Sequence, residues 1–211
     1  MELPLFLIAF IIGFIASFPI TGPVSMMILK KTLEGKYPQG IAISLGAALT
    51  EIIYSAIGIS VIGILAGQSS NIKSTLGIIS SFLLLVIGVY FLKYKVRESE
   101  ISGIKDFHKT NKKKNFFTGV LLIGLNPTII FTWSAISALL VGLNLATFRT
   151  MNEIILFAVS AGIGIFAGSL AIIFVILKNK RFFSEKIIKN LFKLFGLILV
   201  SLSIYGFFKL T

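Results

Sequence analysis

The stretch SFPITGPVS, at residues 17–25, decides how the rest of the chain is interpreted. It lies inside the first long apolar segment, where a transmembrane helix would otherwise continue. Pro19 and Pro23 each remove a backbone donor and crowd the preceding turn, and Gly22 adds backbone freedom. In hydrocarbon an unpaired amide is costly, so non-helical backbone persists only where protein or a water-filled cavity covers it. The stretch therefore predicts either a small polar pocket inside a helical bundle or a proline kink that only shapes packing.

A second interruption with similar chemistry favours the pocket. The sequence LNPT at residues 125–128 breaks another long apolar segment in the same way. The polar side chains around the two interruptions are Ser17, Thr21, Ser25, Asn126 and Thr128.

The composition is that of a polytopic membrane protein. The 211 residues are 56% hydrophobic and only 13% charged, and the mean hydropathy is +0.98. A soluble enzyme of this length would carry more charge and shorter apolar runs. The chain contains no cysteine, which excludes disulfides and thiolate metal ligands.

Six apolar segments are long enough to cross a hydrocarbon core of about 30 Å as helices. A lone segment in lipid must be helical, because only a helix satisfies its own backbone. We therefore predict an all-α membrane protein with six transmembrane helices, of which the first and fourth are each two half-helices broken at Gly-Pro and Asn-Pro. The segments are 3–28, 40–66, 75–92, 116–141, 152–177 and 190–208.

Basic residues in the first, third and fifth loops predict the orientation. These loops hold three, eight and six of them, seventeen of the 20 in the chain. By the positive-inside rule these loops face the cytoplasm and both termini face outside. The net charge of +12 then reflects membrane topology, and nucleic-acid binding by the lysine run 112–114 is not favoured. We expect a multi-pass protein of the cytoplasmic membrane.

The two halves of the chain match loosely and predict an inverted repeat. Gly13 to Pro23 in the first segment has a counterpart in Gly119 to Pro127 in the fourth. Because each half has three spans, the second half must insert upside down relative to the first, as in many secondary transporters. Small residues spaced four apart, which let helices approach closely, occur in the second and fifth segments. They are Gly40, Ser44 and Ala48, and Ser160, Gly164 and Gly168.

This pattern divides the chain into three parts. Residues 1–93 form the first three-helix repeat, 94–115 a basic cytoplasmic loop, and 116–211 the second three-helix repeat. The small-residue faces also permit a homodimer.

Glu51 is the only acidic residue deep in any apolar segment. A charged carboxylate at the bilayer centre costs about 2.5–3.5 kcal/mol even on the mildest insertion scale, and no basic residue lies at matching depth. Glu51 is therefore expected to be protonated part of the time or to face a wet cavity, and either makes it a candidate proton carrier. The alternative is a protonated Glu51 that only donates a hydrogen bond between helices, to Thr50 or a nearby serine. The matching place in the fifth segment holds Ser169.

Trp133, the single tryptophan, follows the second interruption. Two roles are open for it: a wall of the substrate pocket, or a member of the aromatic belt at the membrane interface.

These residues together resemble the lysine exporter (LysE/RhtB) family of amino-acid efflux proteins over nearly the whole chain. The family has Pro-Gly-Pro in the first span, Gly-Asp in the second and Asn-Pro in the fourth. Here Asn126-Pro127 matches, whereas Thr21 replaces the first proline and Thr50-Glu51 replaces Gly-Asp. The residues that carry the resemblance are Gly13, Thr21, Gly22, Pro23, Gly40, Gly46, Thr50, Glu51, Tyr54, Gly119, Asn126 and Pro127.

The resemblance implies export of an amino acid in exchange for protons, with no cofactor and no metal. Half-helix N-termini after Pro23 and Pro127 would offer free amides to the substrate's α-carboxylate, and Glu51 would bind its amino group or exchange a proton. The expected substrate-binding residues are Thr21, Gly22, Pro23, Ser25, Asn126, Pro127 and Thr128. The expected supporting residues are Ser17, Thr50, Tyr54 and Ser169.

Two alternatives remain at this stage, a divalent metal-ion exporter and a passive channel. A metal site needs several oxygen, nitrogen or sulfur ligands, and the segments offer one acid and no histidine. An enzyme is not expected, because no nucleophile–base pair or carboxylate cluster is visible.

Overall fold

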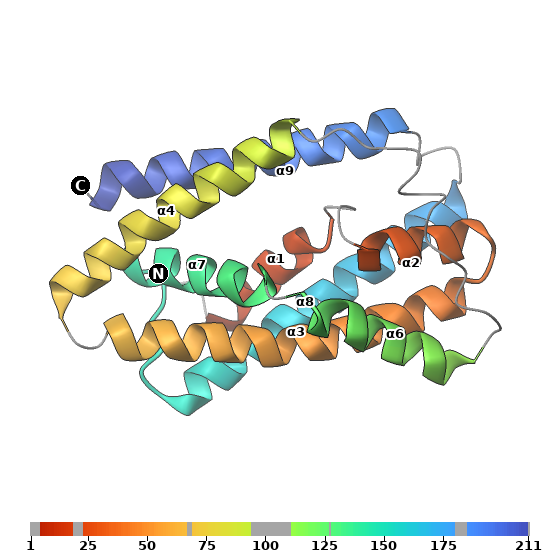
Figure 1. Cartoon of the computed structure of the whole chain (residues 1–211), viewed down its shortest axis with the longest axis horizontal. Coiled ribbons are helices and arrows are strands. Elements are labelled where there is room, and N and C mark those ends of the chain that lie inside the picture. The colour runs from red at the N-terminus through yellow and green to blue at the C-terminus, as the bar shows by residue number, and fades with distance from the viewer. Residues whose placement is uncertain are drawn as a thin grey trace.

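The computed structural model describes residues 5–18, 23–66, 69–93, 111–126, 128–179 and 185–210. Within these residues the chain forms eight helices and no strand (Figure 1). Each apolar segment predicted from the sequence is overlapped by at least one of these helices. The helices are α1 (Leu5–Ala16), α2 (Pro23–Leu33), α3 (Tyr37–Ala66), α4 (Ser70–Lys93), α6 (Lys112–Gly124), α7 (Thr128–Gly142), α8 (Met151–Lys178) and α9 (Glu185–Leu210).

Three of the described helices are long and apolar enough to cross a membrane by themselves. They lie in α3 (Tyr37–Leu65), α4 (Ser74–Lys93) and α8 (Met151–Lys178). The pair α6 and α7 makes a fourth candidate span, and its two helices meet at an angle of 64°. The apolar helices Leu5–Ala16 and Gly196–Lys209 are shorter than a full span. The chain is thus a multi-pass, all-helical membrane protein, with three or four candidate spans in the described residues where the sequence predicted six.

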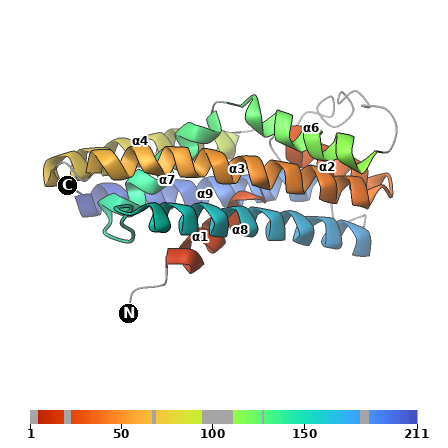
Figure 2. The ribbon, with the colours of Figure 1, turned by 90° about the horizontal axis from the view of Figure 1, so that it is seen from below.

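Glycines allow two pairs of helices to cross in close contact. At the first, α1 packs against α8, and Figure 2 shows it crossing α8 obliquely. A Cβ atom on Gly13 would collide with the carbonyl of Ala161, and one on Gly164 with the carbonyl of Phe10. These helices touch backbone to backbone because neither glycine has a side chain.

The second crossing, of α6 on α3, uses the same device. A Cβ atom on Gly119 would collide with the carbonyl of Ile43, and one on Gly46 with the carbonyl of Phe116. Close packing at these two glycines fixes α6 against α3.

Helices α4 and α9 lie side by side along one edge of the molecule (Figures 1 and 2). Gly88 and Gly196 face each other across this contact, since a Cβ atom on either would meet the other's carbonyl within 3.0 Å. Near the far end, the Ser203 hydroxyl donates to the carbonyl of Ser81 at 2.6 Å. Both serines are fully buried.

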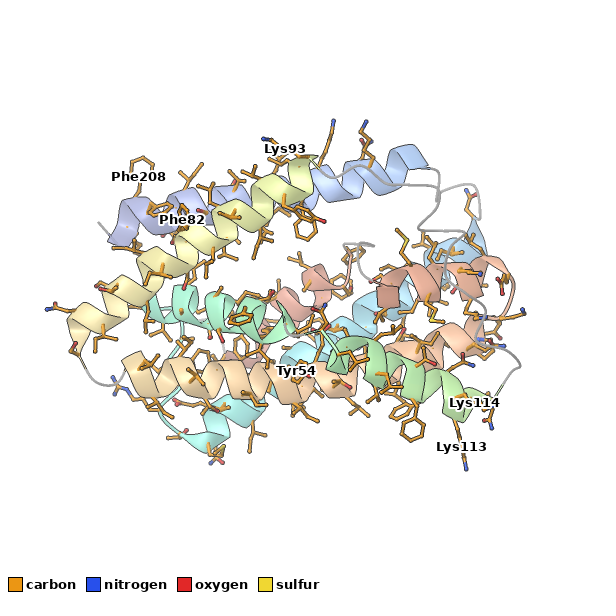
Figure 3. All side chains as sticks on the ribbon, in the orientation of Figure 1. Tyr54, Phe82, Lys93, Lys113, Lys114 and Phe208 are labelled. Atoms are coloured by element: carbon orange, nitrogen blue, oxygen red, sulfur yellow. The ribbon has the colours of Figure 1, made fainter. Side chains whose placement is uncertain are left out.

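Large apolar side chains cover the outer surface of the bundle. Phe82 on α4 is 58% exposed and Phe208 on α9 is 84% exposed, and Phe208 points away from the bundle in Figure 3. Such surfaces are costly in water and are expected where helices face lipid.

Candidate functional site

A cavity of about 280 Å³ lies among the eight described helices. It is lined by the end of α1, the first turn of α2, the middle of α3, the junction of α6 and α7, and the inner face of α8. Leu84 on α4 and Leu199 on α9 complete an apolar side. The polar residues lining it are Ser17, Ser25, Glu51, Asn126, Thr132, Trp133 and Ser169. Residues that the sequence singled out in four separate segments thus line one cavity.

Glu51 lies in the middle of α3 and is partly buried beside the cavity. Its carboxylate accepts a hydrogen bond from the indole N–H of Trp133, with Nε1 to Oε2 at 3.3 Å. No lysine or arginine among the described residues forms an ion pair with it. The carboxyl group therefore has one donor among the described residues and lines the cavity, which is how a group that binds a cation or a proton would be placed.

Trp133 belongs to the wall of the cavity and not to an interfacial belt. Its side chain is only 2% exposed and contacts the ring of Phe157 edge-on, with centroids 6.3 Å apart. Phe157 in turn packs edge-on against Phe148 at 5.2 Å. This buried aromatic cluster fixes the indole ring, and the ring holds the Glu51 carboxylate in one orientation. The sequence showed that Trp133 follows an interruption, but nothing in it paired the indole with Glu51.

The junction between α6 and α7 presents polar groups to the cavity. The end of α6 is closed by the amides of Leu125 and Asn126, which donate to Leu121 and Ile123 carbonyls at 2.9 Å each. Asn126 then lines the cavity, and α7 begins at Thr128. Pro127 lies outside the described residues.

Tyr54 supports this junction from α3. Its hydroxyl donates to the carbonyl of Gly124 at 2.5 Å, so it satisfies one of the carbonyls that the end of α6 leaves without a helical partner. Figure 3 shows Tyr54 in the middle part of α3, beside α6 and α7. Tyr54 does not line the cavity itself. It ties the second interruption to the helix that carries Glu51.

Replacing Tyr54 with phenylalanine is expected to lower the free energy of unfolding by about 1 kcal/mol, because the Gly124 carbonyl loses its partner. The loss of stability is detected as a lower temperature at which half of the detergent-solubilised protein is lost from the monodisperse peak in size-exclusion chromatography. Tyr37→Phe, at the exposed start of the same helix, is the matched control and should behave like the parent protein. Equal behaviour of the two variants would contradict the role given to Tyr54.

The first interruption contributes two serines to the cavity. Ser17 follows α1, is 9% exposed, and donates from its hydroxyl to the carbonyl of Phe14 at 2.7 Å. Ser25 lines the cavity from the first turn of α2, which begins at Pro23. Thr21 and Gly22 lie outside the described residues, as do the side chains of Pro23 and Thr128.

The two remaining supporting residues differ in position. Ser169 on α8 lines the cavity opposite α3 and is 7% exposed. Thr50 does not line it: its hydroxyl donates to the carbonyl of Gly46 within α3 at 2.9 Å, and it packs toward α6 near Gly124. Thr50 thus belongs to the α3–α6 contact.

No group of three or more histidine, cysteine, aspartate or glutamate side chains in the described ranges has an arrangement that would hold a metal ion. What the cavity offers is one carboxylate, one carboxamide, hydroxyl groups and the first turns of two helices. That set suits a small molecule bearing both a positive and a negative group.

Comparison with known protein families gives a match that covers most of the chain. The family model described as LysE type translocator matches residues 14–207. Among curated proteins and solved structures, none matches significantly.

Proposed function

The chain belongs to the LysE type translocator family, which makes it a membrane transporter of amino acids or related compounds, and we propose that it exports an amino acid in exchange for protons. The observation that carries this proposal is the cavity, in which a single carboxylate faces the beginnings of two helices. Substrate and proton would use the same small space.

The helix beginnings suit the negative end of the substrate. Ser25 and Val24 in the first turn of α2, and Ile129 and Thr132 in the first turns of α7, all line the cavity. The first amides of a helix lack helical partners and carry the positive end of its dipole, so they bind a carboxylate well. Asn126 between the two half-helices adds polar groups of its own.

Glu51 suits the positive end. It lines the same cavity, and its described protein donor is the neutral indole of Trp133. A substrate ammonium would supply the charge that the protein does not. The substrate ammonium and a proton would compete for this carboxylate, so only one of them is bound at a time. The substrate then moves outward on one step and a proton moves inward on the next, which is exchange.

The helix contacts of the two halves of the chain correspond to each other. This supports the inverted repeat, in which residues 1–93 and 116–211 are the two parts that move. Helix α1 of the first half packs on α8 of the second, and α6 of the second packs on α3 of the first, each through a pair of glycines. Helices α4 and α9, the last of each half, pack on each other. An inverted repeat would relate such contacts, and in that plan the halves rock around a site between them. By the positive-inside rule the termini would face outside and the 94–115 loop the cytoplasm.

A transport assay tests the proposal. Purified protein is reconstituted into liposomes loaded with a radiolabelled amino acid, and a pH gradient is imposed, acid on the receiving side. We expect the amino acid to move faster toward the acid side. When a protonophore collapses the gradient, the rate should return to that measured without a pH gradient. Flux that ignores the gradient would indicate a passive channel. Growth of cells overproducing the protein on toxic amounts of each amino acid selects the substrate to load.

A further inference from the structure

A second site lies on the outside of the bundle, between the first turns of α3 and those of α6. It is a groove of about 720 Å³ and is separate from the cavity that holds Glu51. Ile41, Ala42 and Leu45 form one wall, and Phe117 forms part of the other. The two helices touch at Gly46, where a Cβ atom would collide with the carbonyl of Phe116, so the groove narrows where they meet.

The walls of the groove are apolar and open to the surroundings. Leu45 is 42% exposed and Phe117 is 59% exposed. Both lie on helices that are candidate membrane spans, so lipid is the medium expected beside them. An extended apolar groove of this kind on a membrane protein fits a hydrocarbon chain, because the contact replaces loose lipid packing with fixed van der Waals contacts.

The mouth of the groove is positively charged. Lys112 and Lys113, in the first turn of α6, line it, and among the described residues its lining holds no acidic side chain. Asn111 caps this helix by accepting the Lys113 amide at 3.0 Å, so the lysines sit on a well-formed helix beginning. Figure 3 shows Lys113 and Lys114 at the outer end of α6. Two ammonium groups above an apolar slot select a ligand with an anionic head and an apolar tail.

We propose that this groove binds one anionic phospholipid, with an acyl chain between α3 and α6 and the headgroup phosphate on Lys112 and Lys113. A zwitterionic lipid fits less well, since the described residues that line the groove offer its ammonium group no carboxylate. A second copy of the chain also fits less well, because a two-fold contact here would bring four lysines together. The bound lipid would fasten the half-helix α6, and with it Asn126, to the beginning of α3.

Native mass spectrometry of the purified full chain tests this without any transport assay. The protein in detergent receives phosphatidylglycerol or phosphatidylcholine with identical acyl chains, and retained lipid is counted. We expect one phosphatidylglycerol to be retained selectively. The double variant Lys112→Gln/Lys113→Gln should weaken its retention about 25-fold, since each lysine near an anionic group contributes about a factor of five. Ala42→Phe should block retention without changing the charge.

The matched control is Lys114→Gln/Lys178→Gln, which removes two charges from exposed positions outside the groove. It should retain the lipid as the parent protein does. Helix content by circular dichroism shows whether each variant is folded. The proposal would be overturned if the parent protein retained the two lipids equally, or if the control variant lost as much phosphatidylglycerol as the Lys112→Gln/Lys113→Gln variant. It would also be overturned if Ala42→Phe lost a dimer peak that the parent protein shows, because the groove would then hold a second copy of the chain. None of these outcomes bears on the cavity, so failure here leaves the transport proposal intact.

Discussion

Replacing Glu51 with glutamine is expected to abolish proton-driven transport while the protein remains folded. Glutamine has nearly the same shape, and its carbonyl oxygen can still accept the indole N–H of Trp133. Its amide, however, cannot exchange a proton or carry a negative charge. We expect the pH-gradient-driven rate in liposomes to fall on the order of 100-fold, the smaller end of what loss of a proton-transfer group produces.

The control for this variant is Glu34→Gln. Glu34 lies in the turn between α2 and α3, outside the cavity, and pairs with Lys36 at 3.1 Å and with the buried Lys31 at 3.9 Å. The pair with Lys36 is exposed and contributes little, and the contact with Lys31 is long, so transport should stay near the parent rate. Full proton-driven transport by Glu51→Gln would show that the carboxylate has no part in the mechanism. The chain would still belong to the family, but the proposed role of this cavity would be wrong.

The second large effect is expected where α6 crosses α3. Two glycines of α6 can be compared there, one at the tight contact and one outside it. Gly119→Ala places a methyl group against the Ile43 carbonyl, and the crossing helices must separate. Gly124→Ala meets only the Thr50 methyl at 3.9 Å, an ordinary contact. Overpacking of this kind costs about 1–3 kcal/mol, more where backbone is the obstacle, whereas alanine is otherwise favoured over glycine within a helix.

We therefore expect Gly119→Ala to be recovered in much lower amount and to lose its monodisperse peak at a clearly lower temperature. Gly124→Ala should resemble the parent protein in both measurements. Similar behaviour of the two alanine variants would mean that the tight crossing does not hold α6 in place.

Much of this arrangement could be predicted from the chain alone, because lipid leaves few choices. An apolar segment in lipid must be helical, and its prolines predicted either an interruption or a kink near residues 17–25 and 125–128. In the described residues α2 begins at Pro23, and α6 ends at Gly124, just before Asn126. Glycine and serine at four-residue spacing on α3 and α8 likewise predicted close helix contacts. A lone Glu51 in such a segment had to face something polar, and it faces the cavity.

The pairwise contacts could not be predicted, because they depend on how helices far apart in sequence meet. The bond from Trp133 to Glu51 joins α7 to α3, and the bond from Tyr54 to Gly124 joins α3 to α6. Thr50 and Glu51 are adjacent, yet a helix turns about 100° per residue, so one faces α6 and the other the cavity. Residue type gave no means of telling which of the two would face inward.

The absence of cysteine from the chain allows a direct test of the cavity, since a single introduced thiol is the only one present. Ser169→Cys places it on the cavity wall, and Ser55→Cys places it one turn beyond Glu51, where the serine is 1% exposed and does not line the cavity. We predict that a small water-soluble methanethiosulfonate labels Ser169→Cys, that the transported amino acid slows this labelling, and that Ser55→Cys stays unlabelled. A folded Ser169→Cys protein that stays unlabelled, or is labelled equally fast with and without every amino acid, would contradict a water-filled substrate site between the interrupted helices.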